Sequence, residues 1–234
     1  MQYSLAVVAV VLASQTVLGQ KGVVGDCSPL EIVYARATLE AQGLGVLGGP
    51  LLAAVKREVP GATAYAVRYP ASGGDASPIK GIEDVLRYFE TKPKACPQQK
   101  YVLSGYSQGA VVMHRAAPKI EKAILKDRVI ATATFGDGGQ QATKEKPVYN
   151  SPVGPIPVWP EELDGKIIFN CNGKDLTCNP KGDSTADHLK YTSKDYIPKS
   201  AKFIGDAYKK AGGAVKGDGE AGGLLVTRAT IFNS

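Results

Sequence analysis

Histidine, tryptophan and long apolar runs are scarce in this sequence. The scarcity of histidine and of long apolar runs limits the kinds of site and the classes of protein that we expect. The 234 residues include two histidines, and the four cysteines lack the spacings of common zinc sites. We therefore expect no metal and no cofactor. The apolar run at residues 5–12 is too short to span a bilayer, and no later stretch is long enough. Stable membrane insertion is not expected.

Clusters of basic residues are also missing. The net charge is +6, but lysine and arginine are scattered along the chain and form no basic run. This pattern favours an ordinary solvated surface over a nucleic-acid partner. With 44% hydrophobic and 21% charged residues, the chain has enough apolar side chains for a sizeable core, and global disorder is excluded.

The first residues predict export. Residues 1–19 carry no charged side chain, contain the short apolar run, and end in Val17-Leu18-Gly19, the small or apolar pattern that precedes signal cleavage. The alternative is a membrane anchor, for which the run is too short. We predict a signal peptide at 1–19, a secreted, extracellular protein, one folded domain at 20–211, and a flexible glycine-rich tail at 212–234.

The cysteines fit an oxidising compartment. Cys27, Cys96, Cys171 and Cys178 are even in number, and four cysteines allow three pairings. Cys171 and Cys178 are close enough in sequence to close a short loop, which leaves Cys27 to pair with Cys96. We therefore expect two disulfides.

Short apolar runs alternate with helical patterns. Five runs predict buried strands at 32–35, 64–68, 101–104, 129–135 and 166–169. Helices are expected at 50–58, 79–91, 108–126 and 200–210, the third kinked or split at Pro118. This alternation predicts an α/β fold, with about five strands in a mainly parallel sheet and helices on both faces. The proline-rich residues 148–160 are expected to form an extended surface loop.

Two glycine motifs carry different weight. "GLGVLG" at 43–48 matches the dinucleotide-binding pattern, but seven residues separate it from the preceding strand, and no carboxylate ends the second strand. We therefore do not expect a nucleotide site. Gly105-Tyr106-Ser107-Gln108-Gly109 lies between a predicted strand and a predicted helix. A sharp turn there leaves no room beside the serine, and it exposes the hydroxyl at a helix N-terminus.

A serine nucleophile needs a base, and the base needs a group that orients it. His114 lies two helical turns beyond Ser107 and cannot reach back, so we interpret it as a structural or surface residue. His188 follows the last predicted strand, and Asp175 lies inside the Cys171–Cys178 loop. The order Ser107, Asp175, His188 is that of the α/β-hydrolases. Taken singly, His188 fits an ordinary surface residue and Asp175 a turn residue; the ordered set makes them candidates.

These motifs resemble the cutinase family of secreted serine esterases. "YARATLE" at 34–40 is similar to that family's first strand and oxyanion loop, "GYSQG" at 105–109 to its nucleophile turn, "CNGKDLTC" at 171–178 to its cystine-bracketed acid, and "ADHLKY" at 186–191 to its catalytic histidine. The resemblance extends from Cys27 to about residue 209. It implies a single-domain α/β-hydrolase.

The resemblance also implies roles for individual residues. Ser107 would be the nucleophile, His188 the general base and acid, and Asp175 the group that orients it. The backbone N–H groups of Thr38 and Gln108 would form the oxyanion hole. It also implies the Cys27–Cys96 disulfide and an acyl-enzyme mechanism without metal or cofactor. We expect an ester polymer or a small ester as the substrate, and a monomer as the default oligomeric state.

The substrate is less constrained, and three functions stay open. The first is hydrolysis of cutin-type polyester or of short to medium acyl esters. The second is an acetylxylan esterase, and the third is a non-catalytic secreted surface-binding protein. The polar stretch "KGDSTAD" before His188 departs from the apolar rim of some family members. We therefore expect short to medium acyl chains, with Leu44, Val46, Leu47 and Leu189 as the candidate rim.

Overall fold

The five predicted strands form one parallel sheet in the computed structural model, which describes residues 27–74, 76–193 and 195–213. The sheet order is β2-β1-β3-β4-β7, and every neighbouring pair is parallel. The strands are β1 (Leu30–Ala35), β2 (Thr63–Ala66), β3 (Lys100–Tyr106), β4 (Val129–Phe135) and β7 (Ile167–Asn170). Side chains of β1 and β4 are buried on both faces, which explains why the sequence shows continuous apolar runs.

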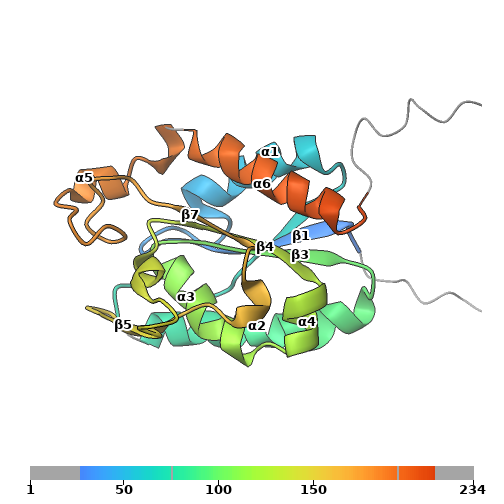
Figure 1. Cartoon of the computed structure of the whole chain (residues 1–234), viewed down its shortest axis with the longest axis horizontal. Coiled ribbons are helices and arrows are strands. Elements are labelled where there is room, and N and C mark those ends of the chain that lie inside the picture. Colours follow the sequence, from blue (N-terminus) through green and yellow to red (C-terminus); the bar gives the residue numbers. More distant parts are fainter. Residues whose placement is uncertain (1–26, 75, 194, 214–234) are drawn as a thin grey trace, which may run out of the picture.

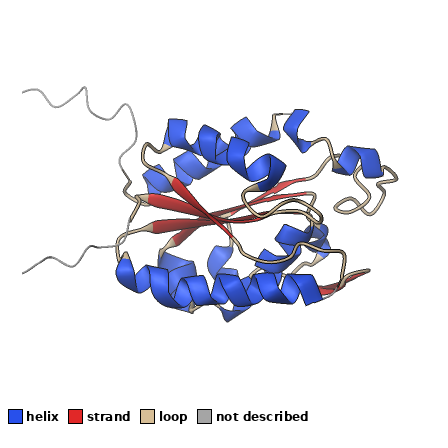
Figure 2. Cartoon of the chain, turned by 180° about the vertical axis from the view of Figure 1, so that it is seen from behind, coloured by secondary structure: helices blue, strands red, loops and turns tan. Residues whose placement is uncertain are grey.

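Helices cover both faces of this sheet. Figure 1 shows α1 (Gly45–Glu58) and α6 (Tyr196–Lys210) on one face, and α2 (Ala76–Ala95), α3 (Gln108–Ala116) and α4 (Lys122–Asp127) on the other. The three layers are equally clear from behind (Figure 2). The predicted α/β class is thereby confirmed. Among the described residues, no helix is long and apolar enough to cross a membrane.

The order of strands places a switch point between β1 and β3. The chain moves from β1 to β2 on one side and then returns to β3 on the other side of β1. In doubly wound sheets, ligands bind outside the carboxyl ends of the strands at such a point. The loop after β1 carries Thr38, and the turn after β3 carries Ser107, so two of the predicted site residues lie at this place.

The start of α1 corrects one prediction. The helix was expected to begin at Pro50, but it begins at Gly45 and includes that proline. The N-cap residue Leu44 gives no side-chain cap, but the carboxylate of Glu40 in the preceding loop accepts a hydrogen bond from the N–H of Val46 at 2.7 Å and so satisfies one donor of the first turn. Later in the helix, a side-chain carbon on Gly48 would lie 2.7 Å from the ring of Tyr34. The glycines of "GLGVLG" therefore serve a turn and close helix packing.

The other three helix predictions also differ in their ends, and α2 is longer at both ends than the expected 79–91. The expected split at Pro118 is present, since α3 ends at Ala116, a 3-10 turn follows at Ala117–Lys119, and α4 begins at Lys122. The last helix begins at Tyr196, four residues earlier than expected. Its buried face is formed by residues three or four positions apart, as a helix on a sheet requires: Ile197, Ala201, Ile204 and Tyr208.

The proline-rich segment is not simply an extended loop. It forms an antiparallel hairpin of β5 (Val148–Ser151) and β6 (Gly154–Pro157). The Ser151 hydroxyl closes the turn by donating to the carbonyl of Gly154 and accepting from the N–H of Val153. Pro155 and Pro157 fit here because a two-stranded ribbon has outer positions that need no N–H donor. Figure 1 shows β5 beneath the carboxyl end of the sheet, beside α3.

Short elements complete that end of the molecule. They are the 3-10 turns η2 (Gly138–Gln141), η3 (Glu161–Leu163) and η4 (Tyr191–Ser193) and the one-turn helix α5 (Thr185–His188). The predicted signal peptide at 1–19 lies outside the described residues, and so does nearly all of the predicted tail at 212–234.

The two disulfides join the predicted partners. Cys27 is bonded to Cys96, and Cys171 to Cys178. The first bond connects the start of β1 to the end of α2, at the amino edge of the sheet. The second closes the loop after β7, at the carboxyl edge. One disulfide therefore lies at the amino ends of the strands and the other at their carboxyl ends.

Removing the Cys27–Cys96 bond should lower stability strongly. The bond spans 69 residues, and loop-closure entropy over that length corresponds to about 4 kcal/mol. We expect the double variant Cys27→Ser/Cys96→Ser to lose about that much free energy of unfolding in urea titrations. An unchanged urea midpoint would contradict this expectation.

Candidate active site

A strained turn holds Ser107. The residue joins β3 to α3 with φ 53° and ψ −115°, a region that L-residues rarely adopt. A side-chain carbon on Gly105 would lie 2.5 Å from the backbone of Gly109, and one on Gly109 would lie 1.9 Å from the carbonyl oxygen of Ala35. Both glycines are therefore required sterically, as the sequence pattern indicated.

Backbone strain within the described residues is concentrated around this turn. The non-glycine residues with positive φ are Leu39, Ala71 and Ser107, which follow β1, β2 and β3 respectively. The N–H of Leu39 donates to the carbonyl of Ala71 at 2.6 Å, so two of the strained loops are bonded directly to each other. Clustered outliers of this kind are typical of functional sites.

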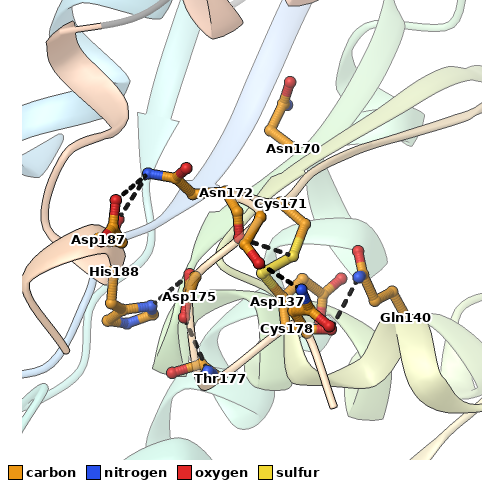
Figure 3. Close-up of a disulfide and its surroundings, with 12 residues drawn as sticks. Asp137, Gln140, Asn170, Cys171, Asn172, Asp175, Thr177, Cys178, Asp187 and His188 are labelled. Atoms are coloured by element: carbon orange, nitrogen blue, oxygen red, sulfur yellow. Dashed lines mark hydrogen bonds and ion pairs between the residues drawn. A yellow bond between two sulfur atoms is a disulfide. The ribbon is translucent and has the colours of Figure 1, made fainter. Parts of the chain in front are cut away.

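His188 lies between the serine and the aspartate. Its Nε2 is 2.9 Å from Ser107 Oγ, and its Nδ1 is 2.8 Å from Asp175 Oδ2. The side chain of His188 is 13% exposed and that of Asp175 is fully buried. Figure 3 shows the ring directed at the carboxylate from α5, while the disulfide lies behind Asp175. The structure thus places His188 within hydrogen-bonding distance of both Ser107 and Asp175.

Several donors surround the Asp175 carboxylate. The Tyr191 hydroxyl donates to Oδ2, and the Thr177 N–H donates to Oδ1 at 2.7 Å. Burial alone would raise the pKa of Asp175, but the hydrogen bonds from His188, Tyr191 and Thr177 outweigh burial and lower the pKa below its usual value. The carboxylate therefore stays ionised opposite the imidazole. The same neighbourhood raises the pKa of Tyr191, through burial first and then through the bond to Asp175.

Gly136 leaves space for the ring and the carboxylate. This residue follows β4 with φ 53°, and a side-chain carbon there would lie 2.7 Å from Cε1 of His188 and 3.1 Å from Oδ2 of Asp175. The hydroxyl of Tyr106 donates to the carbonyl of His188 at 2.5 Å, which fixes the backbone of α5 above the sheet. The imidazole is therefore held by its backbone as well as by its two ring nitrogens.

Thr38 and Gln108 line the same cavity as Ser107. Gln108 is the first residue of α3, so its N–H points out of the helix N-terminus beside the serine. Its side chain is anchored, because Nε2 donates to the carbonyl of Ser72 and Oε1 accepts from Ser77. Both predicted oxyanion residues therefore line the cavity beside Ser107, and the side chain of Gln108 is held by Ser72 and Ser77.

A buried arginine supports the loop that carries Thr38. Arg36 donates to the carbonyls of Glu40 and Tyr69 at 2.8 and 2.7 Å, and its guanidinium lies 4.8 Å from the centre of the Tyr69 ring. Glu40 in turn accepts from the N–H of Ala37 at 2.6 Å. The loop after β1 is thus held from inside by an arginine and a glutamate that flank Thr38.

The cavity beside Ser107 has a volume of about 280 Å³. Apolar side chains from α3, the β5–β6 hairpin and the Cys171–Cys178 loop line it, namely Val111, Val153, Ile156 and Leu176. Val153 and Leu176 are also partly exposed at its mouth. The hairpin therefore forms one wall of the cavity, a role that its proline-rich sequence did not indicate.

The predicted rim residues lie elsewhere. Leu47 is buried in the core, and Leu44 packs against that core. Val46 and Leu189 are exposed but do not line the cavity. The predicted rim was therefore wrong: the cavity is bordered by residues from the hairpin and the disulfide loop, and residues 181–187 ("KGDSTAD") do not line it.

Two contributors to the site were missed in the sequence. Tyr191 lies three residues after His188, inside a motif that was singled out for its histidine alone. Gly136 follows a predicted strand and looks like any glycine at a strand end. Nothing in local periodicity separates them from ordinary residues, since their partners come from distant segments. His114 was interpreted as structural or surface, and it is fully buried.

Chemically, the arrangement suits attack by a hydroxyl on a carbonyl. A base lies within bonding distance of the hydroxyl, an ionised group lies behind the base, and a helix N-terminus faces the place where negative charge would develop. Within the described residues, no group of three His, Cys, Asp or Glu side chains is placed to hold a metal ion.

A doubly wound sheet with this serine turn at its switch point defines the α/β-hydrolase class. The family model that matches the chain is Cutinase, over residues 26–208. The chain belongs to the cutinase family, and the enzyme is a serine carboxylic-ester hydrolase.

Individual relatives agree with that membership. The chain is 32% identical to a cutinase of Kineococcus radiotolerans over 80% of its own length and 64% of the relative's. It is 29% identical to the carboxylesterase Culp1 of Mycobacterium tuberculosis, over 88% of this chain and 96% of that protein. Among solved structures, an acetyl xylan esterase superposes with a TM-score of 0.63 at 26% identity, over 78% of this chain and 99% of that one.

Tyr191→Phe should make the site more sensitive to acid. The lowered pKa of Asp175 means that its ionised form contributes stability above the unfolded value of about 3.9, and that this contribution is lost as the pH falls through the folded pKa. Without the hydroxyl the pKa of Asp175 rises, so the acid-side loss of this stability should begin at a higher pH, which acid unfolding of the variant and the parent measures. We also expect kcat at neutral pH to fall about tenfold. Acid unfolding at the parent's pH would contradict the first expectation, and an unchanged kcat would contradict the second.

Removing the Cys171–Cys178 bond should affect catalysis more than stability. Loop-closure arithmetic for its seven-residue separation gives only about 2 kcal/mol. The bond closes the loop that carries Asp175, so Cys171→Ser/Cys178→Ser should lower kcat more than its melting temperature suggests. The Cys27→Ser/Cys96→Ser variant is the matched control, with the larger stability loss and near-normal kcat while folded. The reverse ranking of kcat would show that the small loop is rigid without its disulfide.

Proposed function

We propose that the protein is a secreted serine esterase that hydrolyses carboxylic esters of short to medium aliphatic acids, including cutin-type polyester. The proposal rests on one observation above all: His188 lies 2.9 Å from the Ser107 hydroxyl and 2.8 Å from the buried Asp175 carboxylate. Family membership supports it, because the reaction class is that of serine carboxylic-ester hydrolases.

The first half of the proposed reaction forms an acyl-enzyme. Ser107 Oγ attacks the ester carbonyl carbon while Nε2 of His188 takes the hydroxyl proton. The carbonyl oxygen becomes an oxyanion beside the N–H groups of Gln108 and Thr38. The C–O bond to the alcohol then breaks, and His188 returns the proton to the departing alkoxide oxygen. Asp175 stays ionised throughout and stabilises the imidazolium.

The second half releases the acid. Water gives its proton to Nε2 of His188 and attacks the acyl carbon, which forms a second oxyanion in the same place. Collapse of this intermediate breaks the bond to Ser107 Oγ, and the proton returns to the serine. Each group ends in the state in which it began, so the cycle needs no co-reactant other than water.

The cavity favours aliphatic acyl groups. Its lining is mainly apolar, and its volume of about 280 Å³ lies at the lower end of ligand pockets. Such a space suits a short or medium chain, for which burial of each CH₂ contributes about 0.8 kcal/mol. An acetylxylan esterase is the second candidate, supported by the likeness to an acetyl xylan esterase of known structure.

The cysteines are the main basis for the proposed extracellular location. Two disulfides are typical of an oxidising environment, and the apolar segment within residues 1–19 supports export. We propose that the mature enzyme acts outside the cell as a monomer, with an ester polymer or a small ester as its substrate.

Ser107→Ala tests the nucleophile. The variant should fold normally and should retain less than about a thousandth of the parent's rate on p-nitrophenyl butyrate, because loss of a triad member usually costs more than that. A fluorophosphonate probe should label the parent at Ser107 and leave the variant unlabelled. Labelling of the variant, or a retained rate, would falsify the assignment.

A series of p-nitrophenyl esters tests the substrate class. We expect kcat/KM to be highest between about two and eight acyl carbons and to decline for longer chains, since the cavity is filled before they are buried. Activity confined to acetate would favour the acetylxylan esterase. A steady rise to sixteen carbons would point to a lipase with a larger apolar surface.

A further inference from the structure

Two adjacent side chains of α3 hold the hairpin that walls the cavity. Arg115 donates through Nε to the carbonyl of Pro155 at 2.9 Å and through Nη2 to that of Val153 at 2.7 Å. Nδ1 of His114 lies 2.8 Å from the carbonyl of Pro157. These three carbonyls alternate along one side of the hairpin, so an imidazole and a guanidinium together bind its outer edge.

The other nitrogen of His114 binds a buried carboxylate. Its Nε2 lies 2.9 Å from Oδ2 of Asp137, and both side chains are fully buried. Both ring nitrogens therefore face oxygen atoms, a backbone carbonyl on one side and a carboxylate on the other. The ring of Trp159 packs against the imidazole, with the ring centroids 4.1 Å apart. Burial would raise the pKa of Asp137, but the charge and hydrogen bond of His114 lower it.

Asp137 belongs to a short segment that touches both histidine–aspartate pairs. Gly136 is pressed against His188 and Asp175, and Gly138 lines the cavity. A side-chain carbon on Gly139 would lie 2.4 Å from Nε2 of His114. The sequence Gly-Asp-Gly-Gly at 136–139 therefore connects the catalytic pair on one side with the pair that holds the hairpin on the other.

We propose that His114 and Arg115 are positioning residues that fix the β5–β6 hairpin as a rigid cavity wall and thereby set the acyl length that the enzyme accepts. This inference rests on the proposed esterase function. Ser107 is the residue directly before their helix, so one rigid element has the nucleophile at its start and the anchors of the wall near its end. The distance from nucleophile to wall is therefore set by a single helix.

A loosened wall should affect long acyl groups more than short ones. An acetyl group has one carbon beyond the carbonyl and stays beside Ser107 and the oxyanion hole. A longer chain has to contact Val153 and Ile156 on the hairpin, so it loses binding when these residues move. The effect should appear mainly in KM for octanoate, with a smaller change in kcat.

Arg115→Ala is the primary test, because this guanidinium is not fully buried and its removal should leave the domain folded. We expect the ratio of kcat/KM for p-nitrophenyl octanoate to that for acetate to fall about tenfold. Arg115→Lys should recover part of the ratio, since an ammonium can still donate to one carbonyl. His114→Gln should change the ratio in the same direction.

Arg128→Ala is the matched control. Arg128 also donates to backbone carbonyls, those of Pro93, Cys96 and Gln99, but at the amino edge of the sheet. It should lower the melting temperature and leave the acyl-length ratio unchanged. If Arg115→Ala changes the ratio no more than Arg128→Ala does, the proposal is wrong.

Hydrogen–deuterium exchange separates this inference from the esterase assignment. Amides of residues 148–157 should exchange faster in Arg115→Ala than in the parent or in Arg128→Ala, and this readout needs no catalysis. Unchanged exchange would overturn the anchoring role even if Ser107 is the nucleophile. Faster exchange with activity independent of Ser107 would uphold the anchor and overturn the proposed function instead.

Discussion

The imidazole of His188 has to meet two groups at once, and much of the carboxyl edge is organised around that requirement. Ser107 follows β3, Asp175 follows β7, and His188 arrives on a separate one-turn helix. No local rule brings these three segments together. The parallel register of β3, β4 and β7 does, because it ends all three strands at one edge. Gly136, at the end of the intervening β4, then removes the side chain that would fill the space between them.

Backbone strain and the long-range disulfide lie at opposite ends of the strands. The described non-glycine residues with positive φ all lie at the carboxyl edge, in the loops around Ser107. At the amino edge, the Cys27–Cys96 bond and the carbonyl contacts of Arg128 tie β1, α2, β3 and β4 together. Strained backbone persists only where the surroundings over-determine it. The long-range disulfide is thus placed where it stabilises the domain without constraining the loops that act on substrate.

The sequence predicted the sheet well because the central strands β1, β3 and β4 are almost entirely buried, and the partly buried edge strands β2 and β7 are also short apolar runs. Continuous apolar runs of four to seven residues are hard to place anywhere else, so all five were identified. Helix starts were less accurate, since the start of α1 depends on the carboxylate of Glu40, several residues upstream and outside the helical pattern. The hairpin was missed for a similar reason. Prolines normally oppose strands, and only the outer positions of a two-stranded ribbon accept them.

The candidate triad could be predicted because it is ordered along the chain, whereas its supports could not. Tyr191 and Gly136 act through contacts with Asp175 and His188, which depend on tertiary packing alone. The role of His114 could likewise be predicted only in part. Its distance from Ser107 correctly excluded it as the base, but nothing in sequence indicated that it binds Asp137 and the hairpin.

The two histidines show how one type of side chain can have two different roles. Each bridges a carboxylate and an oxygen atom, at 2.8 to 2.9 Å on both sides. The partner oxygen of His188 is a hydroxyl, which can give up a proton, so that ring can exchange one with substrate. The partner oxygen of His114 is a carbonyl, which has none to give, and the ring is fully buried. A candidate base therefore differs from an anchor in the chemistry of its partner oxygen and in its access to the cavity. The aspartate–histidine pair itself is common to both.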